Sequence, residues 1–373
     1  MKKGNNGASL ANRIHDLLKQ KQMDEVRELL VQLPEETIRQ KRELGYLRAW
    51  YAVAQSRWED AAEYLCSPPF TRDASEKEAL VSGYTERRRR PRFLLLLGSS
   101  AMELGYAEEA REHFLACLAL LDERRMNVPE LRLQAQYALG ELALQTGWPD
   151  QAVLHYSTAL SLCAKNDDPA FLVTLYSRLC EASYEAEDFT AALGWGHQGL
   201  EFLKTGTSLQ SREDLLVLLA QVCLVMKKFK QAIDYAQEAR QLADQIGNAP
   251  QKVSTRLTLA EIFLAEEQTS EARQYCQQAL DLSPVPEQTL LRGKTLFLYG
   301  KVAEMEWREK PECTRLAEEA KSFYEEARTI FAALPGSTPL IDVLRQLALL
   351  LEQRGSSEQA LAHWKTLYQL AEK

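Results

Sequence analysis

The sequence predicts an all-α fold, a solenoid of helix–turn–helix units stacked along one axis. Residues 132–162 carry the first observation, because Ala152, Tyr156 and Ala159 follow the spacing that places apolar side chains on one face of a helix. A second helix is expected before the turn at 147–149. The second observation is recurrence, since a small residue of the first helix returns at Gly98, Gly140, Cys180, Ala220, Ala260, Gly300 and Ala348. A helix pair cannot bury its apolar face alone, so repeated pairs should stack.

The N-terminal region, 1–90, shows the pattern in weaker form. Two helices are expected between residues 10 and 33, and another pair between residues 44 and 65. They are either degenerate repeats or a small helical bundle that caps the solenoid. Two prolines in 66–70 should end the second pair, because proline removes a backbone donor. We place the domain boundary near residue 90, which leaves 91–373 as the regular array.

Within the array, polar or Pro- and Gly-bearing loops are expected at 123–129, 164–169, 203–212, 245–251 and 282–288. The sixth unit differs from the others. Residues 305–314, which include Pro311, read as about eight residues inserted between its two helices. The run from Arg87 to Arg90 reads as a solvated loop between units; the alternatives are contact with an acidic partner, nucleic acid or a membrane surface.

The pattern resembles the tetratricopeptide repeat. The features that carry the resemblance are a small pair in the first helix, a turn such as GYAEEA at 105–110, and alanine, aromatic and alanine in the second helix. The resemblance implies a right-handed α-solenoid. The units are longer than the usual repeat of about 34 residues. They look more like those of bacterial peptide-sensing regulators, including the Rap phosphatases, and of kinesin light chain.

Composition narrows the function classes. The formal net charge is −8, whereas nucleic-acid binding needs clustered Lys and Arg, so nucleic acid is an unlikely partner. The seven cysteines form no CxxC pair, and four of them occupy small-residue positions of the repeat, as compact apolar side chains would. No secretory signal or membrane span is expected. The sequence therefore predicts a cytoplasmic protein in a reducing compartment.

The sequence lacks four common catalytic and cofactor motifs, GxxxxGK[ST], GxGxxG, HExxH and GxSxG. His113, His155 and His363 share one position of the repeat, so separate units hold them apart, and a metal site is not expected. The sequence predicts no enzyme, no metal and no cofactor.

The predicted binding surface is the concave wall, which the resemblance assigns to the first helix of each unit. The residue after the small position should point into it, which gives Ser99, Glu141, Glu181, Gln221, Glu261 and Lys301. Neighbouring positions add Glu103, Tyr137, Arg178, Tyr184, Glu185 and Lys294. This groove would be acidic in its middle and basic towards residue 300, so an extended protein or peptide with basic groups fits it. The alternative is a solvated groove that is polar without a specific partner.

Two functions remain from this sequence. The first is a protein–protein interaction scaffold that binds a peptide or protein segment, with the concave groove as the expected site. The second is a Rap-like signalling regulator whose array closes on a signal peptide. No catalytic residue of that family maps onto this chain.

Overall fold

The computed structural model describes residues 5–34, 38, 42–55, 57–65, 86–123, 126–163, 169–203, 208–283, 290–334 and 338–371. Every regular element in these residues is an α-helix, which confirms the all-α prediction. The chain divides into two compact units, Met1–Asp168 and Pro169–Lys373, and each is described by itself. Among the described helices, none is both long and apolar enough for a membrane span.

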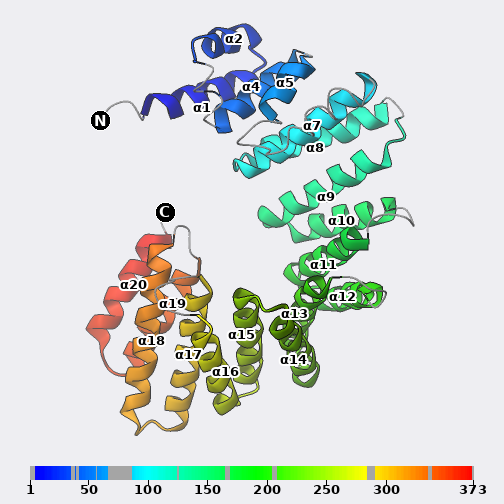
Figure 1. The fold of residues 1–373 in the computed structure, drawn as a ribbon. Coiled ribbons are helices and arrows are strands. Elements are labelled where there is room, and N and C mark those ends of the chain that lie inside the picture. Colours follow the sequence, from blue (N-terminus) through cyan, green and yellow to red (C-terminus); the bar gives the residue numbers. More distant parts are fainter. Residues whose placement is uncertain are drawn as a thin grey trace. The chain divides into compact units, whose positions relative to one another are not determined.

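The described residues of the first unit form four helix pairs (Figure 1). Their bounds are α1 (Asn5–Lys19), α2 (Met23–Val31), α4 (Arg42–Ala54), α5 (Trp58–Leu65), α7 (Glu86–Glu103), α8 (Ala107–Glu123), α9 (Pro129–Gln145) and α10 (Pro149–Leu162). One apolar core runs from Ala11 to Leu142, so the N-terminal helices share it with the first array helices. The domain boundary near residue 90 stays a prediction; the observed division of the chain falls after Asp168.

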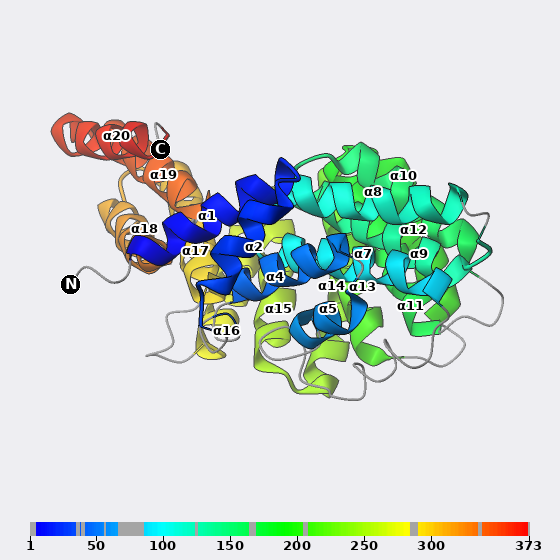
Figure 2. The ribbon, with the colours of Figure 1, turned by 90° about the horizontal axis from the view of Figure 1, so that it is seen from above.

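In the second unit, the part of the chain that the structure describes forms five pairs, of which α19 and α20 are the last (Figure 2). Their bounds are α11 (Pro169–Glu185), α12 (Phe189–Leu203), α13 (Leu209–Val225), α14 (Phe229–Ile246), α15 (Ala249–Ala265), α16 (Thr269–Asp281), α17 (Leu290–Glu309), α18 (Thr314–Ala333), α19 (Thr338–Gln353) and α20 (Ser357–Ala371). Besides its own partner, each first helix contacts the next first helix: α11 contacts α13, α13 contacts α15, and α15 contacts α17. These helices therefore form a continuous inner layer of the unit.

The turn inside the pair has one geometry in six of the described pairs from α7–α8 onwards, and α17–α18 is the exception. The residue seven positions after the small residue is left-handed, as at Gly147 (φ 77°) and Lys227 (φ 57°). The next N–H then donates to the carbonyl five residues back, as from Trp148 N to Ala143 O at 2.8 Å, which is the Schellman arrangement that ends a helix. Lys21 is left-handed as well (φ 58°), and Gln22 N donates to Leu17 O at 2.9 Å. The α1–α2 turn thus has the geometry expected of a degenerate repeat.

Side-chain size is complementary within the pairs. Gly98, Gly140 and Gly300 each face an aromatic ring of the second helix, Phe114, Tyr156 and Tyr324 respectively. At the same repeat positions the middle pairs combine smaller residues, Cys180 with Gly196, Ala220 with Ala236, and Ala260 with Cys276, and all six are buried. Each pair therefore fills a similar space with different residues, which keeps its helices closely packed.

Replacing glycine by alanine should have opposite effects on stability at a closely packed position and at an open one. Packing decides the effect at the first position, and helix propensity decides it at the second. A Cβ added to Gly300 would lie 2.5 Å from Tyr324 Cδ1, so Gly300→Ala is expected to destabilise the chain by about 1–3 kcal/mol. Gly194, exposed in α12, has nothing within 4 Å of its added Cβ, so Gly194→Ala should stabilise by about 0.5–1 kcal/mol. Thermal and urea unfolding of both variants would check these opposite signs. A stabilised Gly300→Ala would contradict the close ring contact.

Two predictions about loops were wrong. The eight extra residues of the sixth unit separate Gly300 from its ring partner Tyr324, but they form helix: α17 and α18 are 20 residues long each, against 17 and 14 in α9 and α10. Only Lys310 to Cys313 lie between them. The arginine run lies in the first turns of α7, which begins at Glu86, and not in a loop.

The predicted structural role of the cysteines at small positions is confirmed. Cys117, Cys180, Cys223 and Cys276 are all fully buried. Burial raises the pKa of the Cys117, Cys180 and Cys276 thiols to about 12, so they remain protonated and pack as apolar groups.

Candidate functional site

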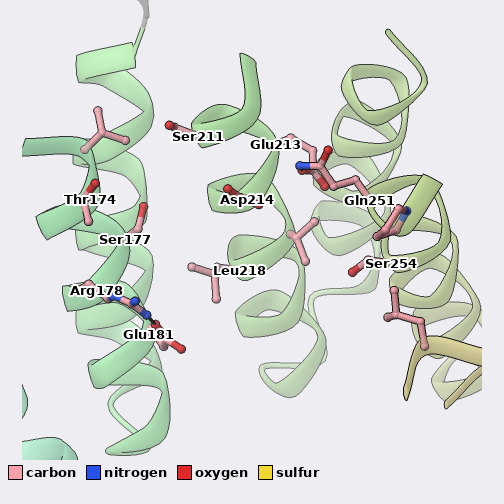
Figure 3. A pocket seen from close by; sticks show the side chains of 14 residues that line it. Thr174, Ser177, Arg178, Glu181, Ser211, Glu213, Asp214, Leu218, Gln251 and Ser254 are labelled. Carbon is pink, nitrogen blue, oxygen red and sulfur yellow. Dashed lines mark hydrogen bonds and ion pairs between the residues drawn. The ribbon is translucent and has the colours of Figure 1, made fainter. Parts of the chain in front are cut away.

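A cleft of about 580 Å³ opens on the inner layer of the 169–373 unit. Residues from four successive first helices line it, because α11, α13, α15 and α17 lie next to one another. Its floor includes the apolar Val173, Val217 and Leu218. Its polar lining consists of Thr174, Ser177, Arg178, Glu181, Ser211, Glu213, Asp214, Gln251 and Ser254. Figure 3 shows these side chains between the three helices that carry them.

Two of the predicted site residues lie in this cleft. Arg178 and Glu181 come from α11 and pair with each other, with Nη1 and Oε2 2.8 Å apart. Both side chains are more than a third exposed, so the pair adds little to stability and can exchange partners. Their guanidinium and carboxylate lie together on the α11 side of the cleft (Figure 3).

Glu213 is the unusual residue of the cleft. It is 2% exposed, and Gln251 Nε2 donates to its Oε2 at 2.9 Å. The pKa of Glu213 is raised to about 7: burial is the main cause, the adjacent Asp214 carboxylate adds to the rise, and the Gln251 hydrogen bond opposes it. A carboxyl group that titrates near neutral pH thus lies inside the wall of the cleft.

Sequence reasoning missed Glu213, Asp214, Gln251 and Ser254. The predicted site residues were chosen at and near the position just after the small residue, whereas these four lie in the first turns of the same helices. A usable signal was present: seven residues before the small position, the neighbouring units have Val173 and Val253, and this unit has Glu213. A carboxylate in a register of buried valines breaks the repeat's apolar pattern.

Three further predicted residues form an electrostatic group on the same inner layer. Glu261 on α15 is exposed, yet the surrounding wall desolvates its carboxylate and raises its pKa, while Lys301 and Lys294 on α17 oppose the rise. Lys301 Nζ lies 4.4 Å from the ring centre of Phe297. Glu261 therefore interacts electrostatically with two lysines of the next first helix, and the predicted change from an acidic to a basic groove stays a prediction.

The remaining predicted residues of the second unit lie outside the cleft lining. Tyr184 stacks edge-on against Phe189, with ring centres 5.8 Å apart. Burial raises its pKa, and the Glu185 and Glu261 charges add to the rise. Glu185 is exposed and Gln221 is half-buried, so the side chains of both can contact solvent.

In the first unit, the predicted residues are partly used by the fold itself. Ser99 Oγ donates to Leu95 O at 3.1 Å in its own helix. Glu141 accepts a 2.6 Å bond from Tyr156, whose ring lies 5.7 Å from that of Tyr137. Glu103 is exposed at the end of α7. Ser99 thus bonds within its own helix and Glu141 and Tyr137 contact the second helix of their pair, and a binding role for these residues stays a prediction.

Two of the three histidines that share a repeat position, His113 and His155, have hydrogen-bonding partners in the protein. His113 is buried and lies 3.2 Å from the Tyr46 hydroxyl, and burial lowers its pKa to about 4. His155 Nδ1 lies 2.8 Å from Gln136 Oε1. In the part of the chain that the structure describes, no group of His, Cys, Asp and Glu is arranged to hold a metal ion.

Comparison with known families identifies the repeats. Two family models, both described as tetratricopeptide repeat, match residues 211–284 in one case and residues 91–120 and 133–166 in the other. These segments correspond to α13–α16, to α7–α8, and to α9–α10. No curated protein sequence matches the chain.

Solved structures resemble the whole chain in fold. The apo form of RapI is 12% identical over 98% of both chains, with a TM-score of 0.59. The apo form of the quorum sensor NprR from B. thuringiensis is 14% identical over 98% of this chain and 99% of that one, with a TM-score of 0.60. PH0952 from Pyrococcus horikoshii, a STAND protein with a tetratricopeptide repeat sensor, is 14% identical over 93% of this chain and 58% of its own, with a TM-score of 0.52.

At these identities the similarity concerns the fold alone. The helix pairs, their shared turn and the matched segments agree with one another. Residues 91–120, 133–166 and 211–284 therefore match tetratricopeptide repeats, and the chain has the all-α solenoid fold of the solved structures that resemble it.

Proposed function

We propose that this chain binds an extended peptide or protein segment on the inner layer of its repeats, and that the cleft between α11 and α17 is the centre of the site. Tetratricopeptide repeats form protein–protein interaction scaffolds, and stacked repeats use an extended inner surface for binding. The observation that carries the proposal is the cleft itself, which four successive first helices line with hydroxyl, amide and charged groups over an apolar floor.

The charges of the cleft favour a basic segment. Glu181 and Asp214 contribute carboxylates against the single guanidinium of Arg178, before Glu213 is counted. Complementary charge increases the association rate and excludes acidic partners more than it adds to affinity. A segment with a basic residue near its centre is therefore the expected partner.

Filling the cleft should abolish this binding. Random dodecapeptides displayed on phage are selected against the immobilised full chain, and a selected peptide is synthesised for fluorescence anisotropy. Ser254→Trp, which places an indole in the cleft, is expected to weaken binding by at least about tenfold. Gln237→Trp, at an exposed position of α14, is the matched control and should bind like the unmodified chain. Equal binding by both variants would exclude the cleft as the site.

Reversing the charge of the predicted acidic residues measures the electrostatic contribution to peptide binding. The triple variant Glu141→Lys, Glu181→Lys and Glu261→Lys should bind the same peptide more weakly, and the difference should shrink at high salt. Unchanged binding would place the partner on the second helices or on residues 1–90.

A second candidate is a peptide-sensing regulator. The similarity to RapI and to the quorum sensor NprR extends over nearly the full length of all three chains, and supports this candidate at the level of fold. A sensor should change shape when it binds the selected peptide, which small-angle X-ray scattering would detect as a smaller radius of gyration. A scaffold should keep its radius and form a stable complex with a partner protein.

A further inference from the structure

Hydrogen-bond acceptors gather where α13 and α15 meet in the cleft. Asp214 is exposed on α13, and Glu213 is turned beside Gln251 of α15 (Figure 3). The hydroxyls of Ser211 and Ser254 lie on the same lining. Nearly all of these groups accept hydrogen bonds, and the two carboxyl groups are adjacent in sequence.

The position of Glu213 is costly for the fold. The equivalent residues of the neighbouring repeats, Val173 and Val253, are 1% and 2% exposed and pack as ordinary apolar core residues. Glu213 is buried to the same degree, and a buried carboxyl group is unfavourable unless it is fully hydrogen-bonded. Positions that break a local rule in this way are expected where function requires the residue.

Gln251 is left incompletely paired. Its Nε2 donates to Glu213, but its Oε1 is buried and has no hydrogen-bond donor among the described residues. An unsatisfied buried acceptor costs free energy, which an incoming donor would recover. The orphaned amide oxygen therefore points to a donor-rich ligand at this end of the cleft, independently of the carboxylates.

We propose that the Asp214 end of the cleft is the subsite for an arginine side chain of the bound segment, with the guanidinium against the Asp214 carboxylate. This rests on the proposed function and specifies its ligand. A guanidinium presents five N–H donors in one plane, whereas an ammonium presents three from one atom, so arginine matches a row of separate acceptors better than lysine. The only cation among the lining residues, Arg178, is engaged by Glu181 on the α11 side.

Small amides test the subsite without any partner. Nα-acetyl-arginine methylamide is titrated into the full chain at pH 8 and followed by saturation-transfer NMR, beside the citrulline and lysine analogues. Citrulline has the shape of arginine without its charge. The arginine amide is expected to bind saturably and at least about tenfold more tightly than the other two. Asp214→Asn should lose most of this binding, whereas Asp234→Asn, at an exposed position of α14, should keep it.

The outcomes are distinct. Equal binding of the citrulline or lysine amide would overturn the arginine subsite, and so would undiminished binding by both Asp214→Asn and Ser254→Trp. Undiminished binding by Asp214→Asn alone would already overturn the contact with the Asp214 carboxylate. If dodecapeptides bind the cleft but show no arginine preference, the proposed function stands and the subsite fails. If the arginine amide binds while Ser254→Trp leaves peptide binding intact, the subsite stands and the cleft is not the segment's main site.

Discussion

Replacing Tyr324 by alanine is expected to destabilise the 169–373 unit by about 3–5 kcal/mol. The ring is fully buried and occupies the space that Gly300 leaves open on α17. Its hydroxyl donates to Glu304 Oε2 at 2.7 Å, and Glu304 is itself 4% exposed. The substitution removes a large apolar group and leaves a buried carboxylate with fewer partners.

Tyr324→Phe measures the contribution of the Tyr324 hydroxyl alone to the free energy of unfolding. It should cost about 1–3 kcal/mol, because Glu304 keeps only its 2.5 Å bond from Arg308 Nη2 in a site that water barely reaches. Tyr156→Phe is the matched control. Tyr156 makes the same type of bond to Glu141, but that carboxylate is only half-buried, so water can replace the hydroxyl and the loss should be below about 1 kcal/mol.

The location of the effect is part of the prediction. In stacked repeats each pair contacts mainly its neighbours, so the loss should be local. Hydrogen exchange followed by mass spectrometry should show faster exchange in α17, α18 and the adjacent α16 and α19, with α1–α5 unchanged. Equally faster exchange throughout the chain would show that the whole chain unfolds as one unit.

The fold was predictable because its signal is local and repeated. The small residue and its partner sixteen positions later, such as Gly140 and Tyr156, report the same helix contact in several units, so an error in one unit is corrected by the others. Features that occur once had no such correction. Pro311 suggested a loop in the sixth unit, but the chain added a turn to each helix, which preserves their packing.

The candidate site was only partly predictable for the same reason. Arg178 and Glu181 were found because they follow the repeat register, and both line the cleft. Glu213 was missed because burial decides its role, and burial depends on the packing of α13 against α15 and not on spacing within one helix. The break in the valine register was visible in the sequence, but its proximity to Gln251 required the coordinates.

Glu213→Val is expected to make the chain more stable than the unmodified protein as pH rises. The pKa of Glu213 is raised from its usual 4.5 to about 7 in the folded chain, so the folded state holds this proton more tightly than the unfolded state. The stability that this proton confers is fully present below pH 4.5 and is lost as pH rises through 7. This difference corresponds to about 3 kcal/mol.

Valine cannot titrate, and it already occupies the equivalent positions Val173 and Val253. The variant should therefore not lose this stability as pH rises. The free energy of unfolding of Glu213→Val minus that of the unmodified chain should therefore increase by about 3 kcal/mol between pH 4.5 and pH 8.5. Glu213→Val also leaves Gln251 without its acceptor, which lowers the free energy of unfolding by the same amount at every pH. Comparing the difference at two pH values cancels this constant cost. Urea unfolding across this range is the measurement, and Gln237→Val on the exposed side of α14 should give a flat difference.

A flat difference for Glu213→Val as well would mean that Glu213 is as acidic when folded as when unfolded. In that case the cleft would hold a permanent carboxylate, its acidity would not vary near neutral pH, and the fold would bear the cost of a buried charge at every pH.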